Sequence, residues 1–566
     1  MSQLGRGREK VPPRASESVV ERVQVLEAAE DYAVPHQAAA FCTGGRSAAF
    51  GSKALNLLKP KFPLQPAPYV VVGAFVFLYL QLFILPHTPL FLSGNDQSIY
   101  LLDATRMLEG QVLYRDFFNF TPPGTESVYF VLFKLFGARA WIPGGVVILL
   151  GVSLTWLCIV ISNQLMSGAA AFLPALLLLT FPFSTQLDGG HAWFSTLGAI
   201  AALAVTLKAR SPARLIAAGA LSGLSAWFTQ SEGLMALLGL AFFLFWERRR
   251  KQQPWRLLVR AEGCLFGTFA AMLAALNAYF VARAGIKQFI YCTMIFVAKY
   301  YRYDRYNTWR VYGAEPPVLH SWFKLGEFAV WLFIHILVPL VYILFFVRER
   351  QERAARPEQP WERLMLVNCV GLFLFLGVAP APSISRLAAV CLPALVLLGW
   401  FLTFPGKIER VVGRLLWAAA LAIVIVEPVA RQTRWRATLD LPVGRAAFVD
   451  PSAYDEYRWV SMHSLPSQYF FGDEGISFAL GLRNPARVNF ITANEYTTRE
   501  NVRGLIEALE KHRAPLVLWS SQLDYVSPRP GGNHLGPLQS YLRSRYHVAK
   551  TFGNCDQVWE RNDSAR

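Results

Sequence analysis

Long runs of apolar residues set the limits on how this chain can fold. They follow one another from residue 69 to residue 426 and contain 13 to 20 residues each, where a membrane-spanning helix needs roughly 20 predominantly apolar residues. Of all residues, 54% are hydrophobic and only 16% are charged, and the apolar ones form continuous blocks instead of helical stripes. We therefore predict a polytopic α-helical membrane protein with about eleven transmembrane helices. The runs are 69–85, 143–161, 169–183, 193–207, 215–228, 234–246, 263–281, 328–347, 364–379, 387–404 and 411–426.

The Lys and Arg residues that give the chain its net charge of +17 lie mostly in short clusters at the ends of these runs. Such clusters mark the cytoplasmic ends of transmembrane helices, so they predict membrane topology and no nucleic-acid partner. Alternation of the runs places every strongly basic short loop on the side of the N-terminal segment. The protein is therefore predicted to lie in the inner (plasma) membrane with its N-terminus in the cytoplasm. The basic loops are 208–214, 247–256, 348–363 and 407–410.

Three parts follow from this topology. They are a cytoplasmic N-terminal tail at 1–66, a transmembrane domain at 67–430 and an extracytoplasmic α/β domain at 431–566. Outer loops of the transmembrane domain are expected at 86–142 and, rich in aromatic and basic residues, at 284–327. The runs 215–228 and 234–246 are short, so they form either two spans or one broken, re-entrant pair.

The α/β prediction for the last part comes from three local patterns. Thr497 and Glu500 have the spacing of a capping box ahead of an amphipathic helix. Residues 514–520 are typical of a buried strand, and a second amphipathic helix follows. This part of the sequence has no nucleophile motif, no Gly-rich phosphate loop and no metal-ligand spacing, so we predict that it docks on the membrane domain or contacts an acceptor.

The stretch 93–133 gathers carboxylates at a predicted membrane surface. Its sequence favours a short helix with Asn95 or Asp96 as the N-cap, and Asp103 and Arg106 are spaced to pair across one turn. Two interpretations of Asp96 are open: it is a catalytic carboxylate, or it only caps the helix. The carboxylates are Asp96, Asp103, Glu109, Asp116 and Glu126.

An acidic residue, a short helix and LEGQVLYRDFFNFTPPG (108–124), all directly after the first span, resemble the first extracytoplasmic loop of the GT-C glycosyltransferases. The similarity is to the bacterial relatives of dolichyl-phosphate-mannose protein mannosyltransferases and aminoarabinose transferases. GALSGLSAWFTQSEGLMALL (219–238) is similar to a recurring helix pair of that family, and SRLAAVCLPALVLLGW (385–400) is similar to a late segment of it. The resemblance implies a GT-C-like fold and inverting transfer of a sugar from a polyprenyl-phosphate carrier to an acceptor on the outer face.

The resemblance also implies that a first-loop carboxylate is the general base on the acceptor, and by position this residue is Asp96. Partial desolvation at a membrane surface raises the basicity of such a group. The family often has Glu next, whereas this chain has Gln97, which hydrogen-bonds sugar hydroxyls but does not take a proton. A mechanism with two carboxylates therefore needs Asp116 or Asp188. Asp116 alternatively does no more than neutralise Arg115.

Other polar residues lie at the predicted outer ends of helices. We predict that Gln97, Asp116, Asp188, His191 and Glu232 bind the acceptor or the sugar. For three of them a structural interpretation stays open: Asp188 as a turn cap, His191 as a loop histidine with a local hydrogen bond, and Glu232 as a side chain that snorkels to the interface.

The leaving group of such a reaction is a lipid phosphate, which cationic donors stabilise. Arg302, Arg305 and Arg310 lie in the aromatic and basic loop, and Arg386 lies between two spans on the outer side. The loop alternatively is an interfacial anchor belt. Arg386 is the stronger candidate, because an isolated outer arginine opposes the usual charge bias. No cofactor and no metal site are predicted, although a divalent ion is not excluded.

The predicted function is that of a membrane glycosyltransferase, whose partners are a lipid-linked sugar donor and a lipid, polysaccharide or protein acceptor. Two other classes stay open. A transporter or flippase of lipid-linked sugars predicts polar residues near the bilayer midplane and two related halves, yet the sequence shows no convincing internal repeat. A non-catalytic assembly protein of the cell envelope would have its functional part in the C-terminal domain.

Overall fold

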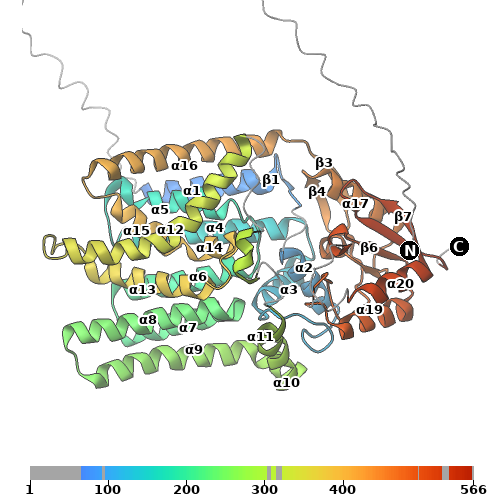
Figure 1. Cartoon of the computed structure of the whole chain (residues 1–566), viewed down its shortest axis with the longest axis horizontal. Helices are drawn as coiled ribbons and strands as arrows, with labels where there is room; N and C mark the ends of the chain where they lie inside the picture. The colour runs from blue at the N-terminus through green and yellow to red at the C-terminus, as the bar shows by residue number, and fades with distance from the viewer. Residues whose placement is uncertain are drawn as a thin grey trace, which may run out of the picture. The chain divides into compact units, whose positions relative to one another are not determined.

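The computed structural model describes residues 66–91, 96–301, 307–313, 322–494, 496–524 and 534–563 (Figure 1). The predicted cytoplasmic tail lies outside these residues, apart from Pro66. The described residues belong to one compact unit. Helices make up most of it, as a chain of apolar runs requires, because a helix satisfies its backbone hydrogen bonds internally.

Every apolar run of the sequence falls on a helix. Among the described residues, five helices are long and apolar enough to cross a membrane, or six if α14 and α15, which are bent by 63° at their junction, form one span. The number eleven therefore stays a prediction. The helices are α1 (Pro66–Leu82), α4 (Trp141–Ser162), α5 (Leu173–Leu178) between the turns η2 (Gly168–Ala171) and η3 (Leu179–Phe183), α6 (His191–Lys208), α7 (Pro212–Phe228), α8 (Gln230–Lys251), α9 (Trp255–Ala284), α12 (Trp322–Glu352), α13 (Trp361–Val378), α14 (Ile384–Val390), α15 (Leu392–Phe401) and α16 (Lys407–Thr433).

Small residues bring α7, α8 and α9 together, and the three helices lie side by side in Figure 1. A Cβ atom on Gly219 would lie 2.3 Å from the carbonyl oxygen of Leu265, so only glycine permits this approach of α7 to α9. A Cβ atom on Gly233 would lie 2.5 Å from Cα of Ala226, at the start of α8. The short runs 215–228 and 234–246 are thus two helices joined at Thr229, and the second extends for 22 residues to Lys251.

Two helices keep most of their apolar surface outside the protein interior. Only 17% of the most apolar window of α9 and 11% of that of α16 is buried, compared with 56% in α4. Lipid tails are as apolar as these side chains, so such faces are stable in a bilayer. Both helices therefore have a face suited to contact with lipid.

The loop at 86–142, predicted to be the first outer loop, contains two helices of its own, α2 (Asp96–Leu108) and α3 (Gly124–Phe136). The predicted short helix is therefore present, and Asp96 is its first residue. Two short strands, β1 (Phe83–Ile84) and β2 (Thr88–Pro89), lead from α1 into the loop. The loop at 284–327 contributes α10 (Ile286–Ile290), η4 (Tyr291–Ile295), α11 (Phe296–Tyr300) and η7 (Trp309–Gly313).

The C-terminal part contains a four-stranded sheet in the order β5–β6–β8–β7, in which β5 and β6 are parallel and the other pairs antiparallel. All four residues of β6 are buried, in agreement with the strand predicted at 514–520. The strands are β5 (Phe470–Phe471), β6 (Leu516–Trp519), β7 (Tyr546–Thr551) and β8 (Gln557–Arg561); a separate hairpin is formed by β3 (Ala437–Leu441) and β4 (Gly444–Phe448).

Helices α17 (Pro451–His463), α18 (Glu474–Leu480), α19 (Arg499–His512) and α20 (Gly536–Arg545) complete this part. The cap of α19 is one residue later than the sequence pattern predicts. Thr498 accepts a hydrogen bond from the backbone N–H of Asn501 at 3.2 Å, whereas Thr497 is bonded to Thr492. The spacing of a capping box identified the helix but not its first residue.

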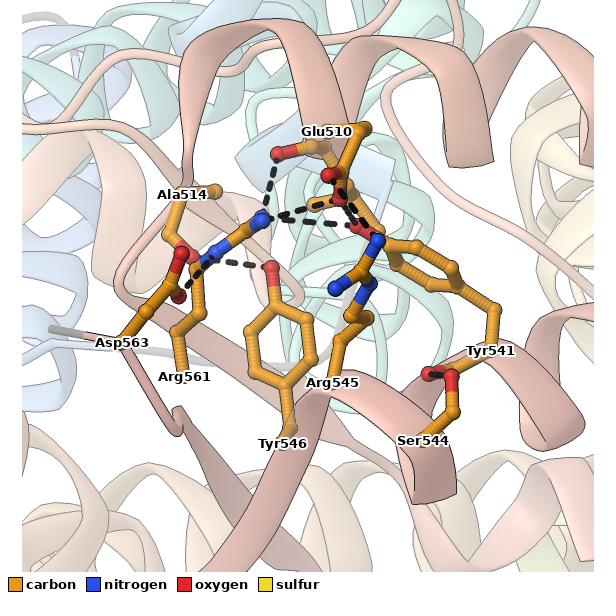
Figure 2. A network of polar contacts seen from close by, with 9 residues as sticks. Glu510, Ala514, Tyr541, Ser544, Arg545, Tyr546, Arg561 and Asp563 are labelled. Carbon is orange, nitrogen blue, oxygen red and sulfur yellow. Dashed lines mark hydrogen bonds and ion pairs between the residues drawn. The ribbon is translucent and has the colours of Figure 1, made fainter.

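A buried arginine holds the ends of this sheet to α19 and α20. In Figure 2 the guanidinium of Arg561 lies between the carboxylates of Glu510 and Asp563, at 2.8 Å and 2.5 Å. Tyr541 donates to Glu510 at 2.7 Å, and Tyr546 donates to the carbonyl of Ala514 at 2.9 Å. Because Arg561 is only 3% exposed, each of its partners compensates for the loss of water.

Candidate functional site

The N-terminus of α2 forms the centre of the candidate site. Asp96 is exposed, whereas the next residue, Gln97, is 5% exposed and accepts a hydrogen bond from the backbone N–H of Gly189. Tyr129 of α3 donates to the carbonyl oxygen of Gly189 at 3.0 Å. A Cβ atom at position 189 would lie 2.1 Å from the Tyr129 hydroxyl, so glycine is required here. These bonds hold the turn before α6 against the start of α2.

That turn carries Asp188 and leads into His191, the first residue of α6. Asp188 accepts from the backbone N–H of Gly190 at 2.8 Å, which is the turn-cap bond that the sequence left open. His191 contacts the hydroxyl of Thr229 at 2.7 Å through Nδ1. The charge of Asp96 acts on both Asp188 and His191, so the structure brings these three predicted residues together.

Burial, together with the charge of Asp96, raises the pKa of Asp188 to about 7. An unfolded chain leaves an aspartate near its usual pKa of about 4. The folded protein therefore binds this proton more tightly, and the contribution of Asp188 to stability falls as the pH rises from about 4 to 7.

Asp188→Asn should therefore alter how stability depends on pH. Asparagine keeps an acceptor for the Gly190 N–H but does not titrate, so the unfolding free energy of the variant should gain roughly 2.5 kcal/mol relative to wild type between pH 5 and pH 8. Thermal and chemical unfolding of the purified protein across this range would measure it. Asp440→Asn, at an exposed position in β3, is the matched control. An equal pH profile in wild type and Asp188→Asn would contradict the raised pKa.

Glu232 and Arg386 lie at the same side of the helix bundle as His191. Glu232 is in the first turn of α8, is 5% exposed, and has one carboxylate oxygen that no described residue hydrogen-bonds. Arg386, in α14, donates from Nη2 to the Tyr301 hydroxyl at 2.6 Å and to the side chain of Asn307. Its charge acts on both His191 and Glu232, so the cation belongs to the same group of residues.

The other predicted residues have different surroundings. Asp116 pairs with Arg115 at 2.7 Å and accepts from the backbone N–H of Val112 at 2.7 Å, which matches its structural interpretation. Of the two carboxylates proposed to accompany Asp96, Asp188 is thus the one on which Asp96 acts. Arg310 is exposed in η7. Arg302 and Arg305 lie outside the described residues.

A buried polar network joins α2 to the rest of the first loop and to α3. Asp103, which is 0% exposed, accepts from the amide of Asn119 at 2.7 Å, and the same amide donates to Glu126 at 2.9 Å. Burial raises the pKa of both carboxyl groups, and the proximity of Asp103 raises that of Glu126 further. Asp103 and Arg106, whose spacing permits a pair across one turn, form no direct hydrogen bond or ion pair with each other in the described part of the chain.

Asn489 of the C-terminal part takes the place of that ion pair. Its amide nitrogen donates to Asp103, and its amide oxygen accepts from Arg106 at 2.7 Å. Arg106 also donates to the carbonyl of Ala486 at 2.9 Å and lies 4.5 Å from the centre of the Phe117 ring. Asn489 could not be identified from the sequence, because a single asparagine far along the chain carries no signal for such a role.

A second element of the C-terminal part reaches the start of α2. Helix α18 packs on α2, and a Cβ atom on Gly475 would lie 3.2 Å from the hydroxyl of Ser98. Glu474 is the first residue of α18. Burial raises the pKa of Glu474 well above its usual value, and the charges of Asp103 and Asp96 raise it further. Glu474 is therefore a further carboxyl group near Asp96 that the sequence did not indicate.

Aromatic rings from three parts of the chain meet next to Arg386. Phe120 of the first loop contacts the rings of Phe296, Tyr301 and Tyr496, with centroids 5.1 to 6.3 Å apart. Tyr301 also lies under the guanidinium of Arg386, 5.5 Å from its ring centre. The described segments include no group of three His, Cys, Asp or Glu side chains arranged to hold a metal ion. Independence of a metal stays a prediction.

No family model and no curated protein matches this sequence. Two solved structures of ArnT from Cupriavidus metallidurans have a similar fold. The form bound to undecaprenyl phosphate aligns with a TM-score of 0.54 and 15% identity over 88% of this chain and 98% of that one. The apo form gives 0.54 and 16% identity over 87% and 97%. The mycobacterial arabinofuranosyltransferase AftD aligns with a TM-score of 0.46 and 12% identity over 88% of this chain and 40% of that one, so the assignment of the fold rests on ArnT.

Proposed function

We propose that this chain, which has the GT-C fold seen in ArnT, is a membrane glycosyltransferase that moves a sugar from a polyprenyl-phosphate donor to an acceptor. The observation that carries the proposal is the position of the exposed Asp96, whose charge acts on Asp188 and His191 while the charge of Arg386 acts on His191 and Glu232. The charges of the proposed base and of a cation thus both act on one histidine. The undecaprenyl phosphate in the ArnT structure supports a lipid phosphate as the donor's carrier.

Asp96 is the proposed general base. Burial raises the pKa of Asp188, Asp103 and Glu474, so these neighbours hold their protons more tightly than an ordinary carboxyl group. Asp96 is the exposed member of the group and is accessible to an acceptor. In the proposed reaction it takes the proton of the acceptor hydroxyl, whose oxygen bonds to the anomeric carbon while the bond from that carbon to the phosphate oxygen breaks. Attack opposite the leaving group inverts the anomeric configuration.

Arg386 is the proposed partner of the leaving phosphate. Negative charge develops on the phosphate as its bond to the sugar breaks, and a preorganised cation stabilises it without reorganisation. Tyr301, Asn307 and the carbonyl of Ala381, at 3.1 Å, hold the guanidinium in one orientation. The rings of Phe120 and Tyr496 beside Tyr301, with Phe296 against both of them, offer an apolar and stackable surface for the lipid or the sugar.

The direct test supplies the purified protein, in lipid nanodiscs, with a panel of polyprenyl-phosphate sugars and a membrane extract as acceptor source. Mass spectrometry should show that one donor is consumed and that free polyprenyl phosphate accumulates, and the anomeric configuration of the product should be opposite to that of the donor. Movement of these lipids across a bilayer with no consumption of donor would instead establish a transporter. Retention of configuration would overturn the inverting mechanism.

A further inference from the structure

A cavity lies at the opposite end of α8 from the candidate site. It has a volume of about 530 Å³ and is lined by residues at the start of α7, the end of α8 and the start of α9, together with Glu362 of α13. The candidate site is near Glu232, in the first turn of α8, whereas the cavity reaches Lys251 in its last turn. At 1.5 Å per residue, a helix of this length separates the two by roughly 30 Å. The cavity is therefore a separate site, on the side predicted to be cytoplasmic.

The charges around the cavity are unbalanced. Arg210 is paired with Glu247 at 2.5 Å, and Lys251 contacts Glu247 and Glu362 at 2.7 Å and 2.9 Å. These two cations and two carboxylates neutralise one another. The cavity is lined by two more cations, Arg248 and Arg260, and no acidic side chain pairs with either of them within the described part of the chain.

Arg248 has an unused buried donor. Its Nε atom is shielded from solvent and has no hydrogen-bond partner in the described chain, and its guanidinium lies 4.4 Å from the centre of the Trp255 ring. A buried N–H of a charged group that lacks an acceptor is costly, so an anionic oxygen placed in the cavity would remove that cost. Arg248 therefore points to an anionic ligand.

Apart from Gln253, the rest of the wall is apolar. It continues onto the face of α9 that is suited to contact with lipid. Leu215, Leu244 and Leu258 line the cavity. Leu257, which also lines it, is 53% exposed, and Trp255 beside it is 54% exposed on α9. A ligand with one anionic group and a long apolar chain would place its charge at Arg248 and its chain along α9.

We propose that this cavity binds the headgroup of an anionic phospholipid. Basic pockets between transmembrane helices on the cytoplasmic side are suited to such headgroups. A free phosphate shares the anionic chemistry but leaves the apolar wall unused, so the phospholipid is the occupant that matches both halves of the site. This binding is independent of the proposed transferase reaction.

Native mass spectrometry of the full chain, with phosphatidylglycerol or phosphatidylcholine added in matched amounts, tests the proposal. Wild type should retain phosphatidylglycerol preferentially, and the double variant R248Q/R260Q should retain about tenfold less of it. The matched control is R249Q/R250Q, which removes the same charge from exposed neighbours that do not line the cavity. It should change retention less than twofold.

A second variant is expected to bind more lipid, so its result cannot be explained by a failure to fold. Glu362→Gln removes a negative charge from the cavity wall and should increase retention of phosphatidylglycerol severalfold. If R248Q/R260Q and R249Q/R250Q lost the same amount of bound phosphatidylglycerol, the lipid would be attracted to the basic surface in general, and the proposal would be overturned. So would equal retention of both lipids by wild type, or displacement of phosphatidylglycerol by millimolar inorganic phosphate, which would identify free phosphate as the ligand.

Discussion

Asp96→Asn should lower the rate of sugar transfer about a thousandfold, since a positioned general base contributes on the order of 10² to 10⁴ to a rate. Asparagine caps a helix as well as aspartate does, so the substitution preserves any structural role of the residue at the start of α2. It removes only the ability to take a proton. The initial rate of donor consumption at saturating donor measures the effect, and the thermal midpoint should stay unchanged.

The control for this experiment is Glu109→Gln, which removes another exposed carboxylate of the first outer loop. Glu109 follows α2 and pairs with Arg483 of the C-terminal part at 3.1 Å. Its loss should leave the transfer rate within about twofold of wild type, since exposed ion pairs contribute little. An Asp96→Asn variant as active as wild type would show that Asp96 only caps α2. Asp188 would then be the carboxylate to test next.

Asn489→Ala should reduce the free energy of unfolding by about 3 kcal/mol. The amide of Asn489 bonds to Asp103 and Arg106, which are 0% and 5% exposed. Its removal leaves a buried carboxyl group and a buried guanidinium each short of a partner, and breaking a buried polar pair in this way is strongly destabilising. Unfolding of the purified protein in mixed micelles would measure the change.

Asn163→Ala is a matched control for that substitution, because Asn163 is an exposed asparagine after α4. It should change the unfolding free energy by less than about 0.5 kcal/mol. If Asn489→Ala were equally mild, the network would not be needed to hold the C-terminal part on α2. Asn489→Ala should also lower activity, because α2 carries Asp96 at its first turn.

The sequence was most informative where hydrophobicity decides the structure. Every apolar run is mostly helical, because an apolar segment in a bilayer has to satisfy its own backbone. Helix ends were predicted less well. The apolar run at 234–246 gave no indication that α8 continues through four basic residues to Lys251, since helical backbone bonding does not depend on hydropathy.

Only those residues of the candidate site that lie near the ends of apolar runs were predicted from the sequence. Asp96, Asp188 and His191 lie next to the ends of apolar runs. The predicted topology therefore put all three on the same side of the membrane. Contacts between distant residues had no sequence signal, and Asn489 is therefore a finding of the structure. The spacing of Asp103 and Arg106 permits a direct pair across one helical turn, but it carries no information about Asn489, which bonds to both side chains.

The bond between Asn489 and Asp103 joins residues that are 386 positions apart. Ribosomes add about 5 to 20 residues each second, so Asp103 is made roughly 20 to 80 seconds before its partner. During that interval Asp103 still lacks the amide that joins it to Arg106. The candidate site is thus completed only when the C-terminal part has followed, and a nascent chain stalled before residue 489 should bear an open and hydrated first loop.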